Sequence, residues 1–153
     1  MKLNVNTKPY KLKPYLIPNE LVLVIDTREQ LPLFTRTKDL LIVKRKLDNG
    51  DYSLQGFEDK FVIERKGIND FYAYISSERN KTEEKMKRLQ SFMFAGLVIE
   101  ANESDLLAHQ LYTKTSPEVA RQSLVSFEVR YGVHVYYSRS PQMQLRNNHH
   151  RCH

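Results

Sequence analysis

Three side chains that could act together on a phosphodiester lie close to one another in the sequence: Asp51, Glu64 and Lys66. Two carboxylates supply the hard oxygen ligands that an ion of the Mg²⁺ type prefers. An ammonium can sit beside the attacking water or the scissile phosphate. These residue types at this spacing indicate metal-dependent cleavage of a phosphodiester bond.

The segment that carries them has the pattern of a β-hairpin. Residues 55–60 would form the connection, with turn chemistry supplied by Gly56 and its polar neighbours. Symmetric pairing then sets Tyr52 against Ile63 and Asp51 against Glu64. Directly opposed residues lie about 5 Å apart at Cβ, and like charges at that separation are unfavourable unless a positive charge lies between them.

Alternation divides the hairpin into two faces. We expect a core face formed by Tyr52, Leu54, Phe61 and Ile63, and an outward face that carries Asp51, Ser53, Val62, Glu64 and Lys66. The alternative is an exposed hairpin with ordinary salt bridges, from Glu64 to Lys66 or to a neighbouring strand. The agreement between the two strands, apolar inward and acidic outward, favours a site.

A third acid follows a continuous apolar run. Residues 21–25 (LVLVI) are typical of a strand buried on both faces, and Asp26, Thr27, Arg28 and Glu29 come directly after it. Charged residues at the end of a buried strand commonly belong to a site. The alternative is that Asp26 caps the following turn and Arg28 pairs with Glu29.

Together these blocks resemble a known family. Residues 24–29 (VIDTRE), Gly50-Asp51-Tyr52, and Glu64-Arg65-Lys66 with Asp70 four residues on resemble the nuclease domain of the XPF family of structure-specific DNA endonucleases. That family belongs to the restriction-endonuclease-like nucleases, which share an Asp, a spacer and then Glu-x-Lys. The resemblance runs from about Leu21 to Tyr137.

The resemblance implies a role for each matching position. Asp51 and Glu64 would be ligands of Mg²⁺ or Mn²⁺, and Lys66 would orient or activate the attacking water. Asp26 and Glu29 would assist at the metal or its water shell, with Asp26 as a further ligand. Arg28 and Arg65 would contact phosphate or brace the acids, and Asp70 would support the site.

One position departs from the family pattern. The family usually carries a basic residue on the next helix and a Gln or Glu four positions later. Here the candidates are Arg79 with Glu83, or Lys81 with Lys85, and the second pair would replace the acid or amide with a cation. We prefer Arg79 and Glu83.

The charge balance suits a polyanionic partner. The chain has 24 Lys and Arg against 18 Asp and Glu, a net charge of +6. Electrostatics supply most of non-specific DNA affinity, although many proteins reach this charge without binding nucleic acid. Lys44, Arg45 and Lys46 could follow a phosphate backbone or form a solvated strand edge, and Lys85 and Arg88 could face DNA or solvent.

Three functions remain open. The first is an endonuclease that cuts branched, flapped or junction DNA. The second is a restriction-type or Holliday-junction-resolving nuclease on the same core. The third is a catalytically inactive, nuclease-like domain that binds DNA or a partner protein. A homodimer or a separate DNA-binding partner would supply further selectivity.

The remaining pattern predicts an α/β fold with a restriction-endonuclease-like core, a central mixed β-sheet flanked by helices. We expect an extended basic arm at 1–19, the nuclease domain at 20–140 and a flexible tail at 141–153. Expected elements are a connection over 30–39, strands at 40–47, 97–100 and 133–137, and helices near 68–75, 81–94, 105–111 and from Ser116. The second helix would turn Met86, Leu89 and Met93 inward.

The composition also bounds the compartment. The single cysteine, Cys152, excludes an intramolecular disulfide, which favours a reducing, intracellular location. No apolar run approaches membrane-spanning length, and the N-terminus lacks the apolar core of a signal peptide. The histidines beside Cys152 at the tail are most simply a disordered terminus rather than a metal site.

Overall fold

A computed structural model describes residues 21–30 and 41–138 of the chain. The predicted arm at 1–19, the connection after Gln30 and the tail at 141–153 lie outside the described residues. None of the described helices is long and apolar enough to cross a membrane.

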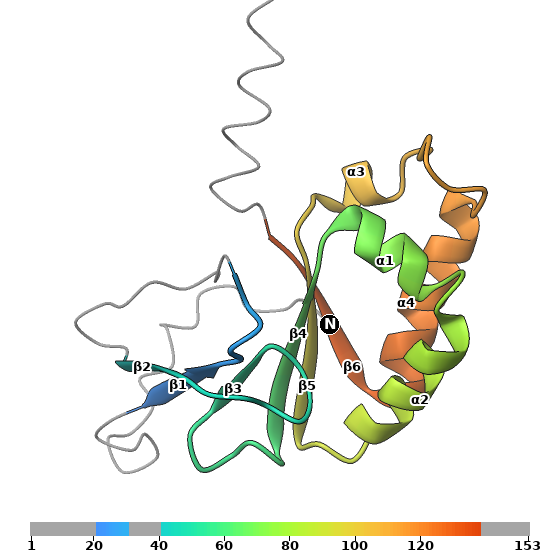
Figure 1. The fold of residues 1–153 in the computed structure, drawn as a ribbon. Helices are drawn as coiled ribbons and strands as arrows, with labels where there is room; N and C mark the ends of the chain where they lie inside the picture. Colours follow the sequence, from blue (N-terminus) through green and yellow to red (C-terminus); the bar gives the residue numbers. More distant parts are fainter. Residues whose placement is uncertain (1–20, 31–40, 139–153) are drawn as a thin grey trace, which may run out of the picture.

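The centre of the fold is a mixed sheet, as the sequence predicts (Figure 1). The described strands are β1 (Val22–Ile25), β2 (Leu41–Lys44), β3 (Tyr52–Leu54), β4 (Phe61–Lys66), β5 (Phe94–Ile99) and β6 (Val133–Tyr137). They lie in the order β2-β1-β3-β4-β5-β6. The pairs β1–β3 and β3–β4 are antiparallel, while β1–β2, β4–β5 and β5–β6 are parallel.

The described helices gather on one face of the β4–β5–β6 half of the sheet (Figure 1). They are α1 (Ile68–Tyr74), α2 (Arg79–Leu89), α3 (Glu103–Leu106) and α4 (Pro117–Tyr131). Phe71 of α1, Met86 and Leu89 of α2, and Leu97 of β5 are almost fully buried in the cluster between these helices and the sheet. This main core fixes α1 and α2 against β4, the strand that carries Glu64.

Local signals explain where α4 begins and ends. Ser116 accepts a hydrogen bond from the amide of Val119, Pro117 opens the first turn, and Gly132 closes the helix at a φ of 66°.

Two predictions about the helices are wrong. The helix expected near 105–111 is only α3, which leaves His109 in the following loop, and Met93 lies beyond the end of α2 with 83% of its surface exposed.

The register of the hairpin is confirmed, but its predicted outward face is wrong. Tyr52 pairs with Ile63, and Tyr52 packs in a smaller cluster with Leu23 and Ile25. The opposite face is not solvent-exposed, because α1 and α2 cover it: Val62 is 1% exposed and Glu64 is 4% exposed. The face of β4 that carries Val62 and Glu64 is therefore the more deeply buried one, and the other face is partly buried.

Candidate active site

Asp51 is positioned by the backbone where β3 meets its neighbours. Its amide donates to the Ile63 carbonyl at 2.8 Å, and its carbonyl accepts from the Asp26 amide at 2.9 Å. The preceding Gly50 has a φ of 72°, and a Cβ there would lie 2.3 Å from Val62 Cγ2. Glycine is required at this position by conformation and by space. The chain thereby holds Asp51 close against β4.

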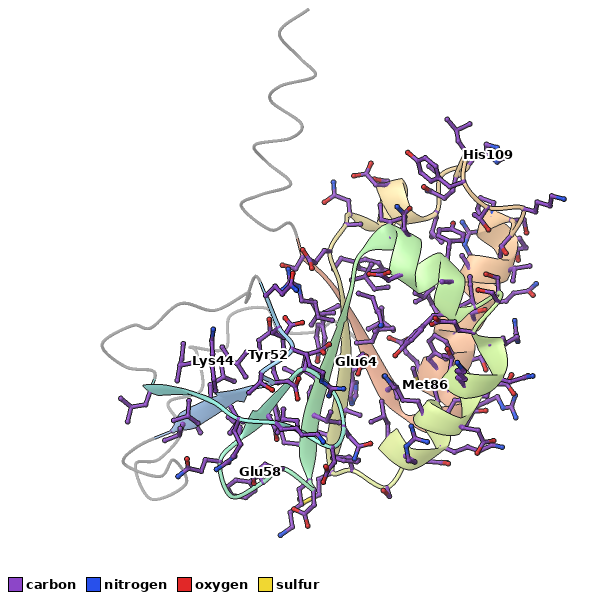
Figure 2. All side chains as sticks on the ribbon, viewed as in Figure 1. Lys44, Tyr52, Glu58, Glu64, Met86 and His109 are labelled. Atoms are coloured by element: carbon purple, nitrogen blue, oxygen red, sulfur yellow. The ribbon has the colours of Figure 1, made fainter. Side chains whose placement is uncertain are left out.

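Glu64 enters the same region from β4, on the side of the sheet that the helices cover (Figure 2). One of its carboxylate oxygens, Oε1, is surrounded by donors. The Tyr74 hydroxyl donates to it at 3.0 Å, the Lys85 ammonium lies 2.9 Å away and the Lys66 ammonium 3.7 Å away. The other oxygen, Oε2, is buried and has no hydrogen-bond partner among the described residues. An orphaned carboxylate oxygen of this kind is suited to a cation.

The electrostatics of Asp51 reflect the nearby Glu64. Burial, followed by the negative charge of Glu64, raises the pKa of the Asp51 carboxyl from 3.8 to about 6, although the Arg65 amide, which donates to Oδ2 at 2.8 Å, opposes this. Burial and Glu64 also raise the pKa of Tyr74 above its ordinary value, so its hydroxyl stays protonated as a donor. The Asp51 carboxylate, whose ionisation is disfavoured by burial and by Glu64, would gain from a positive ion bound between the two acids.

These residues fit a small divalent cation. Mg²⁺ is usually bound through one or two carboxylates and completes its shell with water and substrate oxygens. Asp51 and Glu64 would be those two ligands, with the unpartnered Oε2 facing no competing donor among the described residues. The predicted acid pair is therefore assembled by the fold.

The predicted third metal ligand, Asp26, is not part of this pair. Its Oδ1 accepts from the Arg28 amide at 2.9 Å and from Arg28 Nε at 2.7 Å, while Oδ2 accepts from the Leu47 amide at 2.6 Å. These donors, with the Arg28 side chain first, lower the pKa of Asp26 to about 2 against the effect of burial. No cluster of three metal-ligating side chains occurs in residues 21–30 and 41–138. Asp26 thus caps the turn after β1, the alternative that the sequence left open.

Glu29 and Arg65 lie on the opposite face of the sheet, where they brace the strand ends. Glu29 Oε2 accepts from the Tyr52 hydroxyl at 2.7 Å and from Arg65 Nη1 at 2.9 Å, and Arg65 Nε also pairs with Glu100. Arg65 therefore ties the chain after β1 to the chain after β5, across β3 and β4. Glu29 pairs with Arg65 rather than with Arg28, and its predicted place in the metal's shell is not supported by these contacts.

Comparison with known proteins agrees with this architecture. The family model described as the ERCC4 domain matches residues 25–146, most of the chain. The chain belongs to the ERCC4 domain family. XPF from Aeropyrum pernix has a similar fold, with a TM-score of 0.59 and 16% identity over 80% of this chain and 56% of that one. The same protein in complex with DNA gives 0.62 and 16%, over 84% and 62%. No curated protein matches.

The family and fold predicted from the sequence are thus confirmed for this ERCC4 domain. The chain spans less than two thirds of the length of the solved XPF chains that it matches. At this level of identity the likeness establishes the fold and leaves the site to be argued from its own residues.

The helix position of this ERCC4 domain differs from the preferred prediction. Arg79 and Glu83 form a surface pair at 3.4 Å, with both side chains largely exposed, and neither contacts Asp51 or Glu64. Lys85, two residues after Glu83 on α2, contacts Glu64 instead. The preference for Arg79 and Glu83 as supporting residues is therefore not supported by these contacts, and Lys81 with Lys85 is the pair that lines the pocket beside Glu64.

A pocket opens beside the acids of the ERCC4 domain, with a volume of about 600 Å³. Its charged lining residues are four cations, which outnumber two acids: Lys66, Lys81, Lys85 and Arg88 against Glu78 and Glu84. Tyr74 forms part of the wall, and the Lys66 ammonium lies 4.3 Å from the centre of its ring. The pocket can accept an anion, and its lysines continue from the buried carboxylate to the surface.

Other predicted positions lie apart from this pocket. Asp70 is exposed in the first turn of α1, where an acid favours the helix dipole. Lys44, Arg45 and Lys46 are exposed at the end of the edge strand β2, and Arg45 pairs with Glu58. None of these four lines the pocket beside Glu64.

Sequence reasoning missed Tyr74. Its side chain is buried, its hydroxyl donates to Glu64 and it accepts from Lys85 at 2.8 Å. The signal was present, because Tyr74 follows the buried Phe71 by three positions on a helix and therefore shares its inner face.

Proposed function

We propose that this ERCC4 domain is a metal-dependent DNA endonuclease that hydrolyses phosphodiester bonds in branched, flapped or junction DNA. The observation that carries the proposal is the pair Asp51 and Glu64, in which a buried carboxylate oxygen has no hydrogen-bond partner among the described residues. The pair lies beside a pocket whose lining has more cations than acids. The family supports the same activity.

Asp51 and Glu64 would hold Mg²⁺ or Mn²⁺. When bound, such an ion supplies positive charge at the phosphate and lowers the pKa of a coordinated water. Other residues of the protein fix the orientation of the two carboxylates. The Arg65 amide, which donates to Asp51 Oδ2 at 2.8 Å, fixes the orientation of that carboxylate. Tyr74 does the same for Glu64 from the helix side.

Lys66 is the residue best placed to act on the substrate. Its ammonium lies 3.7 Å from Glu64 Oε1 and borders the pocket, with 22% of the side chain exposed. From there it can donate to a phosphate oxygen or orient a water for attack, and its place over the Tyr74 ring limits its movement. Preorganised charge of this kind is the usual source of catalysis in phosphoryl transfer.

Phosphate binding would extend outward from Lys66 to Lys81 and Arg88 in the pocket. The net charge of +6 favours a polyanion in general. One similar structure is of XPF in complex with DNA, which supports DNA as the partner of this domain too. Selectivity for branched DNA would come from a second copy of the chain or from a separate DNA-binding protein.

One observation favours a second candidate, a domain that binds DNA without cutting it. The Lys85 ammonium already lies 2.9 Å from Glu64 Oε1, and a permanent cation there would neutralise the carboxylate and oppose the binding of a metal ion. The two candidates make the same prediction for DNA binding and opposite predictions for cleavage.

A nuclease assay separates them. The full chain is incubated with flap, fork, four-way junction and linear duplex DNA in Mg²⁺, Mn²⁺ or EDTA, and binding is followed in parallel by electrophoretic mobility shift. We expect metal-dependent cleavage of branched substrates. Preferential cutting of four-way junctions or of linear duplex would instead indicate a resolving or restriction-type nuclease. Binding with no cleavage under any condition would establish the non-cutting domain.

A further inference from the structure

Lys85 occupies an unusual place for a surface lysine of α2. Its ammonium lies 2.9 Å from Glu64 Oε1 and 2.8 Å from the Tyr74 hydroxyl, and Tyr74 in turn donates to the same Oε1. The three groups form a closed triangle at the bottom of the pocket. Glu64, its acidic member, has only 5% of its side chain exposed.

The contact has a clear electrostatic reason. A buried carboxylate without a positive partner is strongly unfavourable, and an ammonium at hydrogen-bond distance relieves most of that penalty. Lys85 is nearer to Glu64 than Lys66, at 2.9 Å against 3.7 Å. It is therefore the principal counter-charge of Glu64 in the metal-free domain. A divalent ion that binds the free Oε2 would meet the electrostatic repulsion of this ammonium on the other oxygen of the same carboxylate.

The pocket also leaves room for the Lys85 side chain to move away from Glu64. Its side chain is 29% exposed and lines the pocket of about 600 Å³. Rotation about its flexible four-carbon chain would carry the ammonium from the carboxylate into this space. Glu64 and Tyr74 are held by the core, but Lys85 is not.

We propose that Lys85 is an internal cation that opposes the divalent metal at Glu64: its ammonium on Oε1 lowers the metal affinity of the free Oε2, and metal binding favours movement of the ammonium into the pocket. The inference rests on the proposed metal site at Asp51 and Glu64. It assigns to Lys85 a control on metal affinity rather than a part in bond breaking, and it explains how a cation can stand where the family usually has an acid or an amide.

The test measures Mn²⁺ affinity of the full chain by isothermal titration calorimetry, without DNA. Lys85→Met removes the competing charge and keeps an unbranched side chain that is only one atom shorter. Lys87→Met is the matched control, because Lys87 is two residues away on the same helix, exposed, and paired with Glu84 instead. Tyr74→Phe is a second variant, which removes the hydroxyl that holds the ammonium in place. Thermal unfolding confirms that each variant is folded.

We expect the dissociation constant of Lys85→Met for Mn²⁺ to fall by about fivefold or more, within the usual range of coupling between two sites. Tyr74→Phe should shift in the same direction by less, and Lys87→Met should match wild type. A dissociation constant for Lys85→Met equal to or above the wild-type value overturns the inference.

Asp51→Asn distinguishes failure of the inference from failure of the proposed function. If wild type and Lys85→Met bind Mn²⁺ equally and Asp51→Asn does not, the metal site stands and the role of Lys85 is refuted. If no folded variant binds Mn²⁺, or if binding survives Asp51→Asn unchanged, the metal site itself is refuted, and the inference with it.

Discussion

The backbone amide of Asp26 donates to the carbonyl of Asp51 at 2.9 Å, yet the carboxylates of these two residues have opposite environments. Asp26 is fully surrounded by donors from Arg28 and Leu47, and its pKa is lowered to about 2. The pKa of the Asp51 carboxyl is raised to about 6 by burial and by Glu64. One acid stabilises the fold, and its neighbour destabilises the fold until a cation arrives.

Asp51→Asn should therefore stabilise the metal-free protein at neutral pH. The folded-state pKa of Asp51 lies above the ordinary value of 3.8, so the folded state holds the proton more tightly and the free energy of unfolding falls as pH rises from about 4 to about 6. The variant lacks this fall. We expect a gain of about 1–3 kcal/mol at neutral pH, since one pKa unit corresponds to about 1.4 kcal/mol.

Urea unfolding of both proteins in EDTA, repeated between acidic and neutral pH, measures this difference directly. The two curves should diverge with rising pH. Parallel curves would mean that Asp51 is not destabilised by its surroundings.

Asp26→Ala should lower the free energy of unfolding, in contrast to Asp51→Asn. It leaves the buried amide of Leu47 without its acceptor and frees the Arg28 side chain, at a cost of about 2–3 kcal/mol. The pKa of Asp26 is lowered in the folded state. Its contribution to the free energy of unfolding is therefore present above pH 4 and is lost as pH falls toward about 2. Thermal unfolding and Mn²⁺ titration of the same variant check this. A folded Asp26→Ala of unchanged stability that no longer binds Mn²⁺ would restore Asp26 as a metal ligand.

The sequence predicts the acid pair well because a hairpin is local. Tyr52 and Ile63 pair as expected, and that register alone brings Asp51 to Glu64. The sequence does not predict that the second face of the hairpin is also buried. Alternation identifies two faces, but only the packing of α1 and α2 determines that the face with Val62 and Glu64 is covered.

Arg65 should contribute far more to stability than Arg79. The Arg65 side chain is 11% exposed and pairs with Glu29 and Glu100, so Arg65→Met would strand two largely buried carboxylates at a cost of about 2–4 kcal/mol. Arg79→Met removes an exposed pair with Glu83 and a long hydrogen bond to the Ile75 carbonyl at 3.5 Å, together worth about 1 kcal/mol or less. Chemical unfolding of the two variants provides the comparison. Equal losses would contradict the bracing role of Arg65.

Gly50→Ala should be more damaging than Gly56→Ala, although both glycines have positive φ. A Cβ at Gly50 would lie 2.3 Å from Val62 Cγ2, whereas one at Gly56 meets nothing within 4 Å. We expect a cost of about 1 kcal/mol for Gly56→Ala, from backbone strain alone, and about 2–4 kcal/mol for Gly50→Ala. Melting temperatures of the two variants test this. A Gly50→Ala variant as stable as Gly56→Ala would show that β4 can shift enough to accommodate the added Cβ.

The residues that sequence reasoning misplaced are those whose position depends on helix packing. Arg79 and Glu83 have the expected types and spacing, but the turn between α1 and α2 directs them toward solvent and brings Lys85 to Glu64 instead. The pair Lys81 and Lys85 is offset from that pair by two residues, about 200° around the helix, and has the same i,i+4 spacing. Only the docking of α2 on the sheet, through Met86 and Leu89, distinguishes the two pairs.

The most direct test of the account is single-turnover cleavage of a branched DNA in Mg²⁺ by wild type, Glu64→Gln and Glu83→Gln. Both variants remove one negative charge, from the buried acid pair and from the exposed surface of α2 respectively. We predict that Glu64→Gln lowers the rate by about 100-fold or more, as expected for loss of a catalytic group, and that Glu83→Gln cuts at the wild-type rate. Cleavage by Glu64→Gln at the wild-type rate would contradict the assignment of the active site.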